Sequence, residues 1–112
     1  MKLRIIGMLA IVMISMSALA QKADESFKVY GNCEHCKMRI EKTVKSMDGV
    51  TNAVWNQKTK ILRVKFDTTK TDLKKLHLAV ANVGHDTEIA TAKEEVYNQL
   101  PACCKYERKK VE

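Results

Sequence analysis

The sequence predicts an α+β fold, a βαββαβ sandwich in which two helices cover one face of a four-stranded antiparallel sheet. Two observations support this prediction. Short segments that alternate apolar and polar residues are interleaved with two longer segments whose apolar residues recur every three or four positions. In chain order the segments follow the split βαβ arrangement, and a short helical tail comes after them.

The first strand and the first helix flank the first pair of cysteines. Residues 21–26 are polar and are expected to be loose, whereas residues 27–31 alternate as a strand does. From Cys36 onward the apolar residues fall on one helical face, and Gly49 stands where helices commonly end. The apolar residues of that face are Ile40, Val44 and Met47.

The next two strands form a predicted hairpin. Residues 50–56 are the second strand, residues 57–60 are the turn, and residues 61–67 are the third strand. In the third strand one face is expected to be buried, since Leu62, Val64 and Phe66 alternate with Arg63, Lys65 and Asp67.

The second helix is predicted to begin at Thr71, which serves as its cap, and to end before Gly84. Residues 85–90 are predicted to form a short fourth strand with weak alternation. Residues 93–100 are predicted to form one or two helical turns, which Pro101 ends. The inner face of the second helix is formed by Leu73, Leu76, Val80 and Val83.

Residues 1–20 have the pattern of a cleaved signal peptide. A basic start precedes an apolar run, and the Ala-Leu-Ala sequence of residues 18–20 supplies the small residues of a cleavage site. The alternative is a membrane anchor, but the uncharged run of residues 5–20 is short for a span. We therefore expect a mature chain that begins at Gln21 and is periplasmic or secreted, with no stable membrane anchor.

The composition limits the classes of function. The net charge is +7, and the lysines are scattered along an exported chain, so no nucleic-acid partner is expected. The chain is long enough for one small domain. Its four cysteines form one C-x-x-C pair and one adjacent pair, an arrangement that suits a structural disulfide framework poorly.

The C-x-x-C pair carries the clearest chemical signal. Cys33 and Cys36 lie on the predicted loop between the first strand and the first helix. Free N–H groups and the positive end of the helix dipole meet at such a helix start, and both favour thiolate over thiol. Two thiolates at this spacing either bind one soft metal ion or close into a disulfide.

The element order and the cysteine placement together resemble the heavy-metal-associated domain family. The resemblance covers residues 26–92, and besides Cys33 and Cys36 it rests on Gly49-Val50, Val64-Lys65-Phe66-Asp67, Leu73, Val80 and Val83-Gly84. It implies a ferredoxin-like fold and the function of small copper chaperones, metal-binding domains of copper-transporting ATPases and periplasmic mercury-binding proteins. The chain then divides into a signal peptide (1–20), a flexible N-terminus (21–25), the heavy-metal-associated domain (26–92) and a cysteine-containing tail (93–112).

The sequence departs from the family pattern at two positions near the cysteines. Gly31 stands where the family usually has a methionine that packs beneath the metal loop. His85 stands where the family has a tyrosine or a lysine close to that loop. The tail lies outside the family domain, so the resemblance is silent about it.

The expected ligands are Cys33 and Cys36, and the expected ion is soft. Two thiolates suit Cu(I) first and Hg(II) next, whereas Zn(II) would need further ligands. His85 is an additional candidate ligand, and an exposed loop histidine is the alternative. His35 is expected to face solvent. Four residues are expected to be structural: His77, Met38, Met47 and Trp55.

Cys103 and Cys104 allow three interpretations: a second soft-metal site or an extension of the first, a redox pair that protects the first site, or a contact to another protein. The predicted core precedes the tail, so the domain is expected to fold without it.

These observations favour a soft-metal chaperone or scavenger that exchanges its ion with thiolates of a metal-transporting membrane protein or another metal-binding domain. No general base, nucleophile constellation or phosphate loop is visible in the sequence, so an enzyme is not expected. The alternative is a thiol–disulfide oxidoreductase that uses the C-x-x-C pair.

Overall fold

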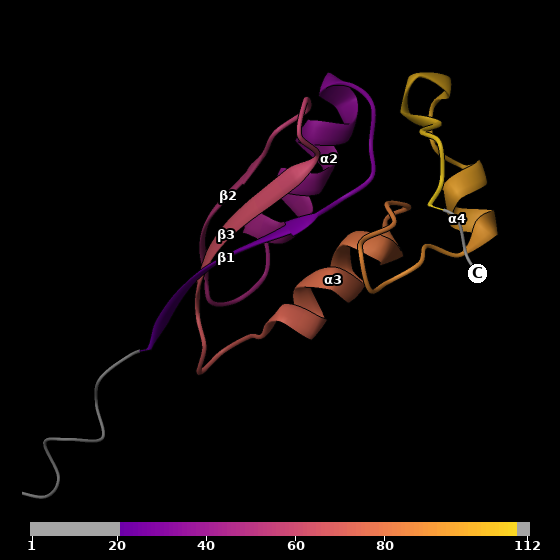
Figure 1. Cartoon of the computed structure of the whole chain (residues 1–112). Helices are drawn as coiled ribbons and strands as arrows, with labels where there is room; N and C mark the ends of the chain where they lie inside the picture. Colours follow the sequence, from indigo (N-terminus) through magenta and orange to yellow (C-terminus); the bar gives the residue numbers. More distant parts are fainter. Residues whose placement is uncertain (1–20, 110–112) are drawn as a thin grey trace, which may run out of the picture.

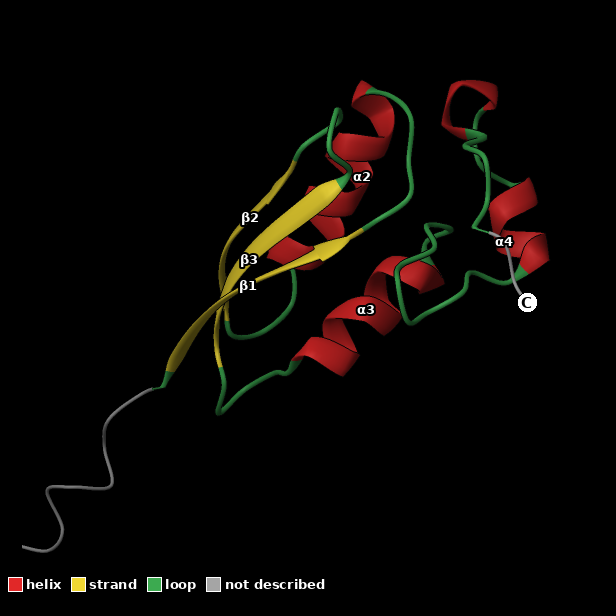
Figure 2. Ribbon diagram, viewed as in Figure 1, coloured by secondary structure: helices red, strands yellow, loops and turns green. Residues whose placement is uncertain are grey.

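The structure is a computed structural model that describes residues 21–109. The signal peptide predicted for residues 1–20 lies outside the described residues. The order of elements is strand, helix, two strands and helix, followed by a tail with two short helical segments (Figures 1 and 2). Within the described part of the chain, no helix is both long enough and apolar enough to cross a bilayer.

The sheet has three antiparallel strands: β1 (Lys22–Lys28), β2 (Val50–Trp55) and β3 (Ile61–Asp67). β3 lies in the centre and pairs with both others. The hairpin turn between β2 and β3 forms as predicted, because the Asn56 side chain accepts the N–H groups of Lys58 and Thr59. β1 begins five residues earlier than predicted and ends at Lys28 rather than at residue 31. Residues 22–26 pair with the second half of β3, so the expectation that the N-terminal residues are loose is wrong.

Two helices follow the predicted pattern. Helix α2 (Glu34–Lys45) ends shortly before Gly49, whose φ of 91° lies in the left-handed region that favours glycine. Helix α3 (Leu73–Asn82) is capped by Asp72 rather than by Thr71, because the Asp72 carboxylate accepts the Lys75 N–H at 2.9 Å. Thr71 instead lies buried in front of the cap.

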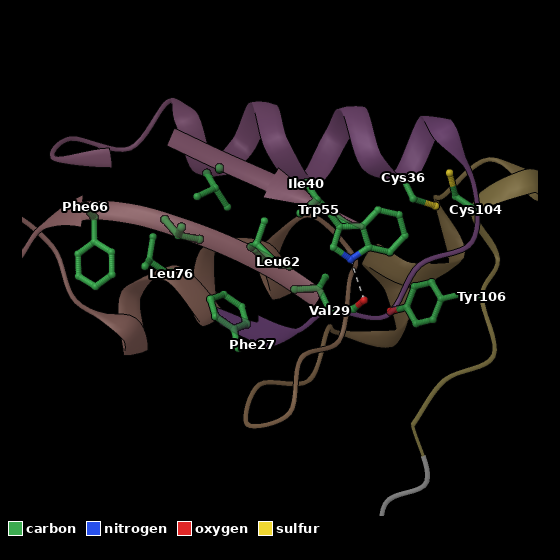
Figure 3. Packing of buried hydrophobic residues seen from close by; sticks show 14 of the residues in the cluster. Phe27, Val29, Cys36, Ile40, Trp55, Leu62, Phe66, Leu76, Cys104 and Tyr106 are labelled. Atoms are coloured by element: carbon green, nitrogen blue, oxygen red, sulfur yellow. Dashed lines mark hydrogen bonds between the residues drawn. The ribbon is translucent and has the colours of Figure 1, made fainter. Parts of the chain in front are cut away.

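Both helices cover one face of the sheet. The buried side chains of β3 alternate with exposed basic ones, so a single face carries the core. Figure 3 shows this core, which extends from Phe66 at one end to Cys36 and Cys104 at the other. Its main apolar members are Phe27, Val29, Ile40, Val44, Trp55, Leu62, Val64, Phe66, Leu76 and Val80.

The fourth strand predicted for residues 85–90 is not formed, and this part of the prediction is wrong. A single antiparallel bridge joins Val29 to Thr87. The Thr87 hydroxyl accepts the Ala90 N–H at 2.9 Å, while the Thr87 N–H donates to the Ala90 carbonyl at 2.8 Å. These two bonds turn the segment back on itself, so it cannot extend along β1.

The tail folds back onto the domain. It contains helix α4 (Glu94–Asn98), labelled in Figure 1, and the 3₁₀ turn η3 (Ala102–Cys104). Residues of η3 contact α2. The expectation that the core precedes the tail is incomplete, because Leu100, Cys104 and Tyr106 are buried members of the core. The tail is therefore an integral part of the folded molecule.

Candidate metal centre

Cys33 and Cys36 lie at the start of α2, where the sequence predicted them. Cys33 is the N-cap residue of the helix and Cys36 is in its first turn. Their sulfur atoms are 3.7 Å apart. The backbone N–H of Asn32 points at the Cys36 sulfur at 3.4 Å, so the loop directs a polar donor at the thiol pair.

The tail brings the second cysteine pair to the same place. The sulfur of Cys104 lies 3.5 Å from that of Cys33, and the sulfurs of Cys103 and Cys104 are 3.9 Å apart. The thiols of Cys33, Cys103 and Cys104 all lie within 4.8 Å of one another. Figure 3 shows Cys36 and Cys104 meeting at one end of the core. All four cysteines of the chain thus form one thiol cluster.

The two cysteines of the C-x-x-C pair differ in their tendency to ionise. Burial raises the pKa of Cys36 to about 11, and its contacts with the Cys104 and Cys33 thiols act in the same direction. Burial also opposes ionisation of Cys33, but this effect is outweighed by donors around its sulfur. The Cys36 N–H and the neighbouring thiols lower the pKa of Cys33 to about 6. Cys33 is therefore the more acidic thiol of the pair.

Arg39 lies beside the thiol cluster and was not identified from the sequence. Its guanidinium lies near enough to Cys104 to lower the pKa of that thiol, against the larger effect of burial, which raises it. The Nη1 atom of Arg39 also lies 3.4 Å from Nε2 of His85. The only signal for this role is its position three residues after Cys36, one helical turn further along α2.

His85 is fully buried, so the exposed-loop alternative is wrong. Its Nδ1 lies 2.9 Å from the Tyr30 carbonyl, which requires Nδ1 to donate, and Nε2 faces Arg39. Burial lowers the pKa of His85 to about 4. With both ring nitrogens engaged, the imidazole links the loop before α2 to the tail, where its ring stacks on Tyr106 at 5.5 Å between centroids.

Polar contacts of the segment after α3 hold the tail in place. The Tyr106 hydroxyl accepts the Asp86 N–H at 2.9 Å and donates to the Gly84 carbonyl at 2.7 Å. The Asp86 carboxylate is almost fully buried, and Arg108 donates to both of its oxygens, at 2.8 and 3.0 Å. The Tyr97 hydroxyl donates to the Tyr106 carbonyl at 2.6 Å. Sequence patterns gave no sign of these contacts, because they join residues far apart in the chain.

The remaining predicted residues take structural or exposed positions. His35 is exposed, whereas His77 is buried, stacks on Phe27 and contacts the Thr87 hydroxyl at 2.6 Å. Met38 lies on the surface of α2, and Met47 packs against the core. None of these residues belongs to the thiol cluster.

The indole of Trp55 fills the space beside Gly31 in the loop before α2. The indole is fully buried, and its Nε1 donates to the Val29 carbonyl at 3.1 Å. A Cβ atom at Gly31 would lie only 3.1 Å from the Trp55 ring and from the Cys36 Cβ. The indole therefore occupies the space that a larger residue at this position would need.

Relatives of known identity support the metal interpretation. The mercuric transport protein periplasmic component of Shewanella putrefaciens is 34% identical over 79 residues, which cover 70% of this chain and 87% of that protein. The copper-exporting P-type ATPase of Staphylococcus aureus (strain Newman) is 39% identical over 57 residues, but these cover 51% of this chain and only 7% of the ATPase. The second match concerns one domain of a much longer protein.

Solved structures agree with the fold. The CopZ metallochaperone aligns with a TM-score of 0.57 at 30% identity, covering 58% of this chain and 98% of that one. Oxidized MerP from Ralstonia metallidurans CH34 aligns with a TM-score of 0.58 at 26% identity, covering 61% and 96%.

The family model described as the heavy-metal-associated domain matches residues 27–86. This span includes the C-x-x-C pair and α3, and it stops before the tail that completes the thiol cluster. The chain belongs to the heavy-metal-associated domain family.

Proposed function

We propose that this protein binds a soft metal ion through Cys33 and Cys36 and passes it on by thiolate exchange. The observation that carries the proposal is the pair of sulfurs, 3.7 Å apart at the start of α2, within a heavy-metal-associated domain. Thiolates select soft ions, and two of them leave the coordination of such an ion open to a further ligand.

The expected ion is Cu(I), with Hg(II) as the next candidate. The relatives named above include copper and mercury proteins, and both ions favour thiolate ligands at low coordination number. Zn(II) prefers four ligands, so the C-x-x-C pair alone would not satisfy it.

Transfer would begin at Cys33, which is half-buried, whereas Cys36 is buried. A thiolate of the partner protein bonds to the ion first, and the bond from the ion to Cys33 then breaks. Cys33 leaves as a thiolate, in keeping with its lowered pKa, the proton of the partner thiol passes to solvent, and the oxidation state of the ion does not change. The expected partner is a metal-transporting membrane protein or another metal-binding domain. A periplasmic location is supported by the mercuric relative and by the predicted leader.

Titration of the reduced protein with Cu(I) against a competing chelator tests the proposal. The double variant Cys33→Ser, Cys36→Ser should lose affinity by more than about a hundredfold, because a hydroxyl is a poor ligand for a soft ion. His35→Ala is the matched control, since this exposed residue lies between the two cysteines, and it should keep the affinity of the parent. Tight binding by the double serine variant would refute the proposal.

A thiol–disulfide oxidoreductase remains the second candidate because of one observation. The low pKa of Cys33 beside the raised pKa of the buried Cys36 is an asymmetry that suits disulfide exchange. Against it, the one proline of the chain, Pro101, precedes η3 and does not lie on a strand over the cysteines. Catalysed reduction of a disulfide substrate, together with weak Cu(I) binding, would favour this function.

A further inference from the structure

We propose that Cys104 supplies a third thiolate to the ion held by Cys33 and Cys36, so that the tail closes the site with a ligand from the same chain. This inference rests on the proposed metal binding. It concerns a residue that lies outside the segment matched to the family, which ends at residue 86.

The distances between the sulfurs suit such a site. Thiolates bound to one ion at about 2.3 Å are separated by roughly 3.8 Å in tetrahedral and roughly 4.0 Å in trigonal coordination. The Cys33 sulfur lies 3.7 Å from that of Cys36 and 3.5 Å from that of Cys104. Both separations are within about half an ångström of the values required. Cys33 is thus placed to share an ion with either sulfur, and an ion bound to all three would have to bring the sulfurs of Cys36 and Cys104 to the same separation.

The tail holds Cys104 at this place by contacts that do not involve sulfur. Tyr106, two residues later, is fixed by hydrogen bonds to Asp86 and Gly84. On the other side of η3, Leu100 is buried against Gly84. Because the segment is anchored on both sides, the third sulfur is in position before an ion arrives, and ordering it adds little entropic cost on binding.

The surroundings offset the negative charge of a three-thiolate site. Three thiolates and one monovalent ion carry a net charge of −2. The Arg39 guanidinium lies near Cys104, and the N–H of Asn32 points at the Cys36 sulfur at 3.4 Å. The positive end of α2 faces the same group of sulfurs. The fixed charge and dipoles next to the site are therefore of the sign that a complex of this kind needs.

The ligand class is a soft ion that accepts three thiolates, as Cu(I) and Hg(II) do. Cys104 is fully buried, whereas Cys103 is exposed, so the buried thiol is the better third ligand. With a third thiolate bound, the ion would be retained in the presence of small competing thiols. Transfer to a partner would then require displacement of Cys104 from the ion.

The test is X-ray absorption spectroscopy of the reduced protein loaded with one equivalent of Cu(I). Three sulfur neighbours are expected for the parent protein and for Cys103→Ser, and two for Cys104→Ser. In Cys104→Ser the affinity for Cu(I) should fall by at least about tenfold, the smallest loss typical of residues that merely support a ligand. The near-identical size of serine and cysteine limits disturbance of the core, and circular dichroism verifies that the variant is folded.

The outcomes separate this inference from the proposed function. Two sulfurs in the parent protein, or three in a folded Cys104→Ser variant, would overturn the role of Cys104 while leaving metal binding by Cys33 and Cys36 intact. Failure of the parent protein to bind Cu(I) would overturn both. If Cys104→Ser does not fold, three sulfurs in both the parent protein and Cys103→Ser still identify Cys104 as the third ligand, and two sulfurs in Cys103→Ser overturn its role.

Discussion

At the scale of single residues, the sequence predicted those positions that depend on a short local motif. Cys33 and Cys36 were placed correctly at the start of a helix, since strand and helix periodicities meet between them. The environment of His85 was not predictable in the same way. Its burial depends on Arg39 and on Tyr106, which approach it from a different helix and from the tail.

The buried His85 should make stability depend on pH. Its pKa is about 4 in the folded protein against an ordinary 6.5, so the unfolded chain binds the proton more tightly. The stability contributed by the neutral ring is complete above pH 6.5 and is lost as the pH falls toward 4. Between pH 6 and pH 5 the slope should approach about 1.4 kcal/mol per pH unit.

Urea unfolding of the parent protein and of His85→Phe at a series of pH values measures this contribution. Phenylalanine keeps a ring against Tyr106 and cannot titrate. Protonation would also place a positive charge beside Arg39, while Asp86 acts in the opposite direction. The variant should therefore lack this part of the pH dependence, whereas parallel profiles would show that the ring does not titrate as stated. His77, whose pKa burial also lowers, is present in both proteins and cancels in the comparison.

At the scale of elements, the predicted periodicities gave the correct types for three strands and two helices, and they failed at the fourth strand. Weak alternation in residues 85–90 reflects a real difference in structure, because Thr87 closes a turn and backbone groups of Asp86 and Thr87 bond to tail side chains. Contacts of this kind join segments far apart in sequence, so local patterns carry no record of them.

The Tyr106 hydroxyl should be the main polar anchor of the tail. Tyr106→Phe leaves the Asp86 N–H and the Gly84 carbonyl without their partner, and we expect a loss of about 2 kcal/mol in the free energy of unfolding. The reaction of Cys104 with a thiol reagent should also become faster.

Tyr97→Phe is the matched control for this change. It removes one hydrogen bond of a half-buried hydroxyl, so we expect a smaller loss of about 1 kcal/mol. Chemical denaturation and thiol labelling of the two variants provide the comparison. Equal losses of stability would contradict the central role of Tyr106.

At the scale of the whole molecule, metal binding should join the tail to the domain. A ligand that binds only the folded state, present at a thousand times its dissociation constant, adds about 4 kcal/mol to the free energy of unfolding. Cu(I) should therefore raise the melting temperature and slow tryptic cleavage after Lys105 and Arg108. In Cys104→Ser the melting temperature should still rise with Cu(I), but the cleavage rate in the tail should change little. Equal protection of the tail in both proteins would argue against a bond between the ion and the tail.

The three-stranded sheet leaves an outer strand, which affects whether copies of this protein associate through their sheets. β1 is an outer strand, and its outer side would invite pairing with a second chain. Along its first half, charged residues such as Lys22, Asp24 and Glu25 oppose such pairing. At its end Glu88 accepts the Lys28 N–H, and Val29, just beyond the strand, pairs with Thr87, so the segment held by the tail covers the strand there. The tail thus helps to cover this end of the outer edge of β1, and its loss would favour aggregation through strand pairing.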